Sequence, residues 1–133
     1  MGSRVLVDTD YLIDYVRRRA ELPEGQWFIS EITLYEFTCG TRDPAEAKKL
    51  LEEEFTVIYH DNEIIERAAG IWRKLRGAGL LVDDRDLLVA AVAIARKLPL
   101  LTRNVKHFER FRPLGLELHP ISLAGSLSGR REG

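Results

Sequence analysis

Cysteine, side-chain amides and long apolar runs are all scarce in this 133-residue sequence. Cys39 is the only cysteine, so no internal disulfide can form, and a reducing, cytoplasmic setting fits the composition. Asn62, Asn104 and Gln26 are the only side-chain amides, and with many Glu, Lys and Arg residues this is a pattern typical of thermophiles. The longest apolar run, Leu87 to Ala95, is shorter than the about 20 residues of a membrane span, so no membrane partner is expected.

A charge excess of either sign is also missing, because 20 basic residues stand against 21 acidic ones, for a formal net charge of −1. A protein that coats nucleic acid without specificity is strongly basic, so this balance argues against that class. It is compatible with an enzyme whose acids gather in one pocket inside a basic rim. Hydrophobic residues make up 45% of the chain, enough to build the core of one ordinary domain.

Short apolar segments alternate with helical patterns along the chain. We expect five strands, at Arg4–Asp8, Trp27–Ser30, Thr56–Tyr59, Leu100–Thr102 and Leu116–His119. We expect helices, caps included, at Asp10–Arg18, Ser30–Cys39, Pro44–Phe55, Asp61–Arg76, Asp83–Lys97 and Val105–Phe111. This alternation predicts a doubly wound, Rossmann-like α/β domain, a parallel five-stranded sheet with helices on both faces. The single domain is expected to span residues 1–121, and the small, polar residues 122–133 to form a flexible C-terminal tail.

Acidic residues follow the expected strands, where open parallel sheets form their sites. Asp8 ends the first strand, Glu36 lies two turns into the helix after the second, and Asp86 begins the apolar part of the helix before the fourth. Structural interpretations stand beside the functional ones, because Asp8 can cap a helix and Asp86 can be favourable charge at a helix N-terminus. Asn104 lies just past the fourth strand.

Glu36 and Asp86 are harder to explain by local structure alone. Glu36 lies in a short, largely apolar helix and shares one polar face of it with Ser30 and Thr33, at a spacing of three residues. Asp86 lies near the N-terminus of an expected helix that is apolar on all sides, where a charged side chain needs a partner or a metal. Clustered carboxylates repel one another without a cation, and their hard oxygens select Mg²⁺ or Mn²⁺.

Four segments, in order, resemble the motifs of the PIN-domain family. Val5–Asp10 (VLVDTD) resembles its opening strand with Asp-Thr, and Ser30–Phe37 (SEITLYEF) resembles its Ser-x-x-Thr-x-x-Glu motif. Asp86–Ala93 (DLLVAAVA) resembles its Asp-x-x-Ile/Val-Ala-Ala-x-Ala motif, and Leu101–Asn104 (LTRN), with Phe108 beyond it, resembles the fourth. The combination is more specific than any one motif, and the length is similar to that of stand-alone VapC-like toxins.

Three positions depart from the family pattern. Asp10 stands where Asn or Ser is commoner, Asn104 replaces the fourth acid, and His107 occupies a neighbouring position that is often acidic. With three acids and a neutral Asn104, we expect the site to carry a charge of about −3, which calls for a cation.

The resemblance implies an endoribonuclease that depends on one or two Mg²⁺ or Mn²⁺ ions, which activate water for phosphodiester cleavage. It implies four catalytic residues, namely Asp8, Glu36, Asp86 and Asn104, of which the three acids bind the metal. The residues expected to support these ligands are Thr9, Thr33 and Thr102.

The resemblance also implies the substrate and the partners. Single-stranded or loop RNA is expected, because an A-form duplex hides its base edges. The basic residues chosen as phosphate contacts cluster beyond the fourth motif, at Arg103, Lys106, Arg110 and Arg112. A cognate VapB-like antitoxin is the expected inhibitor, and the toxin is expected to be a homodimer.

A phosphoryl-receiving signalling domain is an alternative interpretation. Asp8 and Asp10 would form its acid pair, Asp61 would accept the phosphoryl group, and Thr102 would end a strand. That class also needs a Lys at the end of the fifth strand, where the sequence has Leu118–Pro120 (LHP) instead.

Two further alternatives keep the PIN-like fold. A DNA nuclease would use the same acids, although flap-type nucleases carry extra helices for which 133 residues leave no room. A PIN-like scaffold without catalysis would have no need for Asp8, Glu36 and Asp86.

Overall fold

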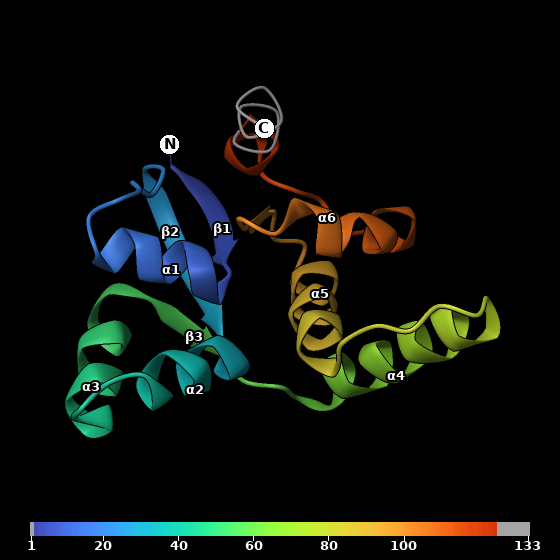
Figure 1. The fold of residues 1–133 in the computed structure, drawn as a ribbon, viewed down its shortest axis with the longest axis horizontal. Coiled ribbons are helices and arrows are strands. Elements are labelled where there is room, and N and C mark those ends of the chain that lie inside the picture. The colour runs from blue at the N-terminus through green and yellow to red at the C-terminus, as the bar shows by residue number, and fades with distance from the viewer. Residues whose placement is uncertain (1, 125–133) are drawn as a thin grey trace.

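A parallel sheet lies between two layers of helices in the computed structural model, which describes residues 2–124 (Figure 1). The strands are β1 (Ser3–Val7), β2 (Gly25–Ser30), β3 (Thr56–Ile58) and β4 (Leu100–Leu101). They lie in the order β3-β2-β1-β4, and each neighbouring pair is parallel. The predicted doubly wound α/β class is confirmed.

The helices begin at the cap residues that the sequence marks. They are α1 (Thr9–Val16), α2 (Glu31–Cys39), α3 (Pro44–Glu54), α4 (Asn62–Gly77), α5 (Asp84–Arg96), α6 (Val105–Phe108) and the 3₁₀ segment η1 (Glu109–Leu114). Ser30, Asp43, Asp61 and Asp83 each accept a backbone N–H of the helix that follows. These bonds satisfy donors that have no partner within the helix, so the short polar side chains set the helix starts.

The prediction of five strands is wrong by one, because the expected strand Leu116–His119 is a single bridge residue. Leu118 pairs with Leu100: the Leu100 N–H donates to the Glu117 carbonyl at 2.8 Å, and the His119 N–H donates to the Leu100 carbonyl at 2.9 Å. Residues 120–124 are helical, so the extended segment ends directly after this pair. Its partner β4 is itself only two residues long.

Alternating side chains of β1 point into two separate cores. Leu6 belongs to the core formed with α4, α5, α6 and η1, whereas Val5 and Val7 belong to the core formed with α1, α2 and α3. Figure 1 shows these two groups of helices on opposite sides of the sheet. The expectation of helices on both faces is therefore confirmed.

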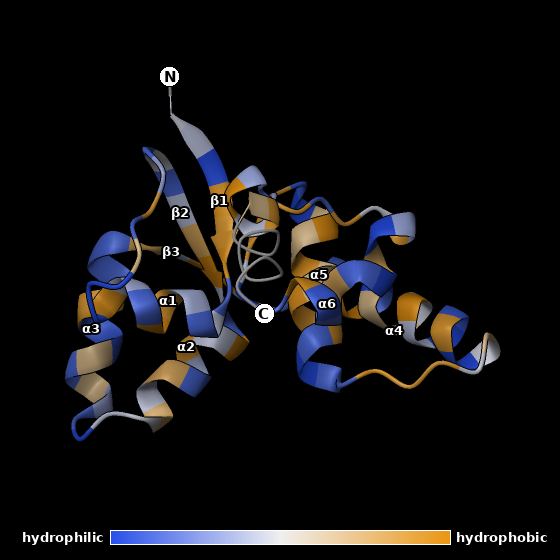
Figure 2. Ribbon diagram, turned by 45° about the horizontal axis from the view of Figure 1, so that its top comes forward, coloured by the Kyte–Doolittle hydropathy of each residue, from blue (hydrophilic) through white to orange (hydrophobic). Residues whose placement is uncertain are grey.

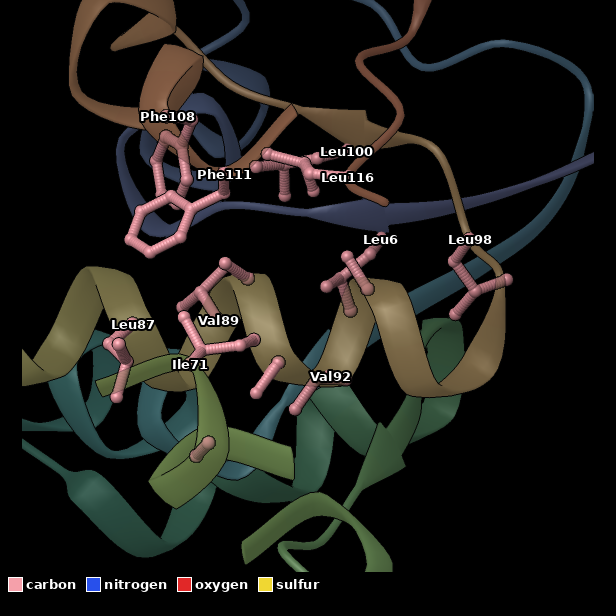
Figure 3. Close-up of a cluster of buried hydrophobic side chains, with 14 of the residues drawn as sticks. Leu6, Ile71, Leu87, Val89, Val92, Leu98, Leu100, Phe108, Phe111 and Leu116 are labelled. Carbon is pink, nitrogen blue, oxygen red and sulfur yellow. The ribbon is translucent and has the colours of Figure 1, made fainter. Parts of the chain in front are cut away.

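Helix α5 is buried along most of its length. Five consecutive residues, 89–93, are at most 2% exposed. Figure 3 shows α5 between Ile71 of α4 and the aromatic pair Phe108 and Phe111, whose ring centroids are 6.0 Å apart. Figure 2 shows hydrophobic residues concentrated in α5 and along β1. The first turn of α5 is thereby held rigidly against the sheet.

Ser122 joins the C-terminal helical residues to the strand β4. Its hydroxyl accepts the Thr102 N–H at 2.9 Å and donates to the Leu100 carbonyl at 3.1 Å, and the residue is 3% exposed. Residues 122–124, assigned to the tail from the sequence, therefore belong to the fold. The remainder of that expected tail, residues 125–133, lies outside the described residues. Between residues 2 and 124, no helix is long and apolar enough to cross a membrane.

Replacing Ser122 with Ala should lower the free energy of unfolding by about 1–3 kcal/mol, because the buried Thr102 N–H loses its acceptor. Ser3→Ala is a matched control, since the Ser3 hydroxyl donates to the Glu24 carbonyl at 3.3 Å on the exposed edge. The control should change stability by less than about 0.5 kcal/mol. Urea denaturation of both variants measures the difference, and equal losses would contradict the anchoring role of Ser122.

Candidate active site

Three predicted acids come together beyond the carboxyl ends of the strands. Asp8 follows β1 directly and is fully buried, and Asp86 lies in the first turn of α5 with 8% exposure. Glu36 comes from α2 and is half-buried. Because α2 follows β2 and α5 precedes β4, the two strands that flank β1 bring both helices to Asp8. The sheet order thus assembles acids that are far apart in the sequence.

Asp8 both caps a helix and belongs to the acidic cluster. Its Oδ1 accepts the Thr9 N–H at 2.9 Å, which caps α1, and its Oδ2 accepts the Thr102 hydroxyl at 2.8 Å. The structural and functional interpretations of Asp8 are therefore compatible, because the cap bond holds the carboxylate at the end of β1.

A chain of hydroxyls leads to Glu36. Oγ1 of Thr9 lies 2.6 Å from Oε1 of Glu36, and it also lies 3.1 Å from Oγ1 of Thr33. Thr33 in turn lies 3.3 Å from the Ser30 hydroxyl, which also caps α2. Each of the three threonines selected from the sequence thus contacts an acid directly or through one hydroxyl.

Arg85 links the three acids, and the sequence did not single it out. Its Nη1 donates to Asp86 Oδ1 at 2.7 Å, its Nη2 donates to Asp8 Oδ1 at 3.3 Å, and its Nε donates to Glu36 Oε2. One signal was available: a cation in the first turn of a helix is opposed by the helix dipole. A basic residue in the run Asp83–Asp86 therefore needs acidic partners from elsewhere in the fold.

Asn104 reaches the site through a fourth acid, Asp10. The Asn104 side-chain amide donates to Asp10 Oδ2, and the Asn104 N–H donates to the Thr102 hydroxyl at 3.0 Å. Within residues 2–124, the buried Oδ1 of Asp10 has no hydrogen-bond partner. The cluster thus holds four carboxylates and the guanidinium of Arg85, a formal charge of −3. This equals the expected value, but a different set of groups produces it.

The donor set fits a hard divalent cation, although the acids now surround a guanidinium. Within the described ranges, no three acidic, His or Cys side chains already converge on one point as a metal site. The carboxylate oxygens of Asp8, Glu36 and Asp86 are the ligands that Mg²⁺ and Mn²⁺ prefer, and the unpartnered oxygen of Asp10 is a further free acceptor. These acids could meet at a metal once Arg85 moves aside.

The four basic residues predicted to bind phosphate differ in their distance from the acids. Arg110 lines a hollow of about 220 Å³ with Asp86 and His107, and His107 Nδ1 is 3.6 Å from Asp86 Oδ2. Arg112 instead lines a hollow beside Lys97, at the opposite end of α5. Of these two arginines, only Arg110 is therefore brought next to Asp86.

The other two basic residues lie near the fourth motif. Lys106 is exposed, and Arg103 donates to Asp14 Oδ2 at 2.9 Å while its guanidinium stacks 4.9 Å from the Tyr11 ring centroid. Both follow β4 directly, so they lie on the same side of the domain as Asn104.

Asp61, the acceptor in the signalling alternative, has a structural environment. Its Oδ1 accepts the Ile64 N–H at 3.0 Å to cap α4, and its Oδ2 pairs with Arg96. Both of its carboxylate oxygens are thus engaged in contacts at the start of α4 and with α5. The arrangement therefore gives that alternative no support.

Burial makes the negative charge of the site unfavourable. Desolvation, followed by the charge of Asp10, raises the pKa of Asp8 to about 7, against the opposing effects of Arg85 and of the Thr102 hydrogen bond. Desolvation also raises the pKa of Asp86, although Arg85 opposes this shift. In Arg85 itself, burial lowers the pKa, but the neighbouring carboxylates outweigh it and the net shift is upward.

The raised pKa of Asp8 predicts a pH-dependent effect of Asp8→Asn. Between its unfolded pKa near 4 and about 7, the folded state keeps a proton that the unfolded state releases, so stability falls as the pH rises. Without divalent metal at pH 8, Asp8→Asn should therefore be more stable than the wild type by on the order of 4 kcal/mol, and the difference should vanish near pH 4.

Denaturation in EDTA across this pH range tests the effect. Asp84→Asn is the control, because Asp84 is exposed and its loss should leave the pH profile unchanged. A wild type at least as stable as Asp8→Asn at pH 8 would rule out a buried, destabilising charge at Asp8.

Comparison with proteins of similar sequence and similar fold supports the family that the motifs indicate. The family model for the PIN domain matches residues 5–112. "Ribonuclease VapC1" of Methanocaldococcus jannaschii is 41% identical over 119 residues, 88% of each chain. "Ribonuclease VapC19" of Mycobacterium tuberculosis is 34% identical, over 82% of this chain and 95% of the relative. A chain of the VapBC-1 structure from nontypeable Haemophilus influenzae has the same fold, with a TM-score of 0.71, 24% identity, and coverage of 87% of this chain and 96% of that one. The protein is therefore a VapC-like member of the PIN-domain family.

Proposed function

We propose that this protein is a metal-dependent endoribonuclease and the toxin of a VapBC-type toxin–antitoxin pair. The observation that carries the proposal is the assembly of Asp8, Glu36 and Asp86, from three separate segments, around one positive charge. A buried acidic cluster is unfavourable unless it binds a cation, so its formation supports a site built for metal. The ribonuclease names of the relatives support the reaction class.

Asp8, Glu36 and Asp86 present the oxygens that would hold one or two Mg²⁺ or Mn²⁺ ions. When bound, the metal supplies an acidified water as nucleophile and offsets the charge that develops on the phosphate. Thr102 and Thr9 keep Asp8 and Glu36 directed at the site through their hydroxyls. Within the catalytic set that the sequence suggested, Asn104 acts indirectly: its amide binds Oδ2 of Asp10 and so orients Oδ1, which has no hydrogen-bond partner among the described residues.

The proposed substrate is single-stranded or loop RNA. Its phosphates need positive groups beside an acidic centre, and Arg103, Lys106 and Arg110 lie on the segment that follows β4. Arg110 and Asp86 line the same hollow, so a phosphate bound by Arg110 would lie close to Asp86. Arg112 faces the other end of α5 and is left out of this proposed contact set.

We also propose a VapB-like antitoxin as partner, and a homodimer as the form of the free toxin. Structures with similar folds include VapBC complexes from H. influenzae and Salmonella typhimurium. Large exposed side chains are available for protein contacts, among them Tyr35 at 66%, Trp72 at 42% and Leu81 at 75% exposure. Exposed aromatic side chains of this kind are enriched at protein interfaces.

Cleavage of single-stranded RNA should require Mg²⁺ or Mn²⁺ and should fall at least about a hundredfold in Asp8→Asn, Glu36→Gln or Asp86→Asn, the scale for losing one group that stabilises transition-state charge. A fluorescent RNA assay with and without EDTA measures both effects. Asp84→Asn is the matched control for Asp86→Asn, since both lie in the first turn of α5 but Asp84 is exposed.

The control should cleave at the wild-type rate. Cleavage that survives EDTA, or that is unaffected by all three site variants, would overturn the proposed chemistry. Preference for single-stranded DNA over RNA of the same sequence would instead select the DNA-nuclease alternative.

Arg110→Gln should weaken RNA binding several-fold and reduce the dependence of log K on log salt by about 0.7, the value for one lost phosphate contact on a single strand. Binding is measured in the Asp86→Asn background, which prevents cleavage. Arg112→Gln is the matched control, because it removes the same charge two residues away but at the other end of α5. Equal slopes in the two variants would place the RNA elsewhere.

A further inference from the structure

The guanidinium of Arg85 bridges the three acids of the candidate site. Arg85 uses three different nitrogens to bind Asp86, Asp8 and Glu36, which come from α5, the end of β1 and α2. Within residues 2–124, no other Lys or Arg forms an ion pair with any of these three acids. The positive charge at the centre of the cluster therefore comes from this single side chain.

Arg85 binds the oxygens that a metal would need. Oδ2 of Asp8 and Oε1 of Glu36 are already engaged by the hydroxyls of Thr102 and Thr9. Of the other two oxygens, Oε2 of Glu36 accepts from Arg85, and Oδ1 of Asp8 accepts from both Arg85 and the Thr9 N–H. A divalent cation that bound these carboxylates would meet the guanidinium in the same place, so the two cations exclude each other.

The guanidinium can leave without unfolding the helix that carries it. The backbone N–H of Arg85 is fixed by the Asp83 cap at 3.0 Å, and the next residues of α5 are packed in the core. The Arg85 side chain is 24% exposed, so a rotation about its side-chain bonds takes the charge into solvent. Exchange of the cation therefore needs a change of rotamer only.

We propose that Arg85 is a built-in counter-cation that occupies the metal position, and that Mg²⁺ or Mn²⁺ binds by displacing it. This inference rests on the proposed function, because it takes the three acids as the metal ligands. Arg85 stabilises the metal-free site and lowers its affinity for metal by the same factor, since it favours only one of the two states. If the guanidinium occupies the site in about nine molecules of ten, the apparent metal affinity is about tenfold weaker.

Removing the guanidinium tests the exchange. Arg85→Gln should bind Mn²⁺ about tenfold more tightly than the wild type, measured by calorimetry or by the paramagnetic resonance of free Mn²⁺ in the absence of RNA. In EDTA the same variant should melt at a lower temperature, because the acids lose their cation, and saturating Mg²⁺ should reduce that difference. Arg85→Lys keeps the charge but carries its donors on one nitrogen instead of three, so it should fall between the two.

Arg96→Gln is the matched control. Arg96 also joins two carboxylates, those of Asp61 and Glu63, and its side chain is 31% exposed. Its removal should leave the dissociation constant of Mn²⁺ unchanged. A change equal to that of Arg85→Gln would show a general effect of charge and would overturn the exchange.

A second measurement uses the wild-type protein, so its result does not depend on the side effects of a substitution. The Arg85 Nε–H donates to Glu36, so before metal is added its proton should exchange slowly with water and give a distinct ¹⁵N–¹H signal. Adding Mg²⁺ should move this signal and speed its exchange. A signal that is unchanged at saturating Mg²⁺ would overturn the proposal.

The outcomes separate this inference from the proposed function. Mn²⁺ binding of equal strength in the wild type and in Arg85→Gln sinks the exchange but leaves the metal site intact. No binding to either protein sinks both. Binding to Arg85→Gln alone would show that metal cannot displace Arg85, which overturns the exchange and also the metal dependence of the wild-type protein.

Discussion

A carboxylate shut away from water at the end of β1 is the constraint on which the site depends. Burying an ionised Asp8 is unfavourable unless donors surround it, and they come from different parts of the chain: the N–H of Thr9, the hydroxyl of Thr102 and the guanidinium of Arg85. Even so, the pKa of Asp8 stays near 7. The charged form of Asp8 is therefore unfavourable even with these donors, and the proposed metal would stabilise it.

Helix α5 connects this electrostatic problem to the stability of the fold. Residues 89–93 lie in the core between β1, α4 and the segment that follows β4, whereas the first turn carries Arg85 and Asp86. A helix fixed along its apolar length cannot shift its first turn without disturbing that core. Asp86 is therefore held by a well-packed helix, while Arg85 beside it keeps the freedom of a long side chain.

The distribution of charge is consistent with an enzyme that binds a polyanion. The site has a formal charge of −3 in a chain of net charge −1, so the remaining residues carry a formal charge of +2. Several basic residues follow β4, and Arg110 among them lines a hollow with Asp86. Under the proposed function, these residues would bind RNA phosphates while the metal offsets the negative charge of the acids.

The sequence by itself determined what depends on neighbours within a few residues. Caps such as Ser30 and Asp61 set the helix starts, alternation along β1 set its two faces, and four motifs placed the acids. Tertiary structure alone decided that the fifth strand is a single bridge, that Ser122 belongs to the fold, and that Asp10 joins the three predicted acids as a fourth carboxylate. It also decided the role of Arg85, whose partners Glu36 and Asp8 are 49 and 77 residues away. Local sequence patterns depend on residues that are close in the chain. The partners of a buried charge depend instead on which strands become neighbours in the sheet.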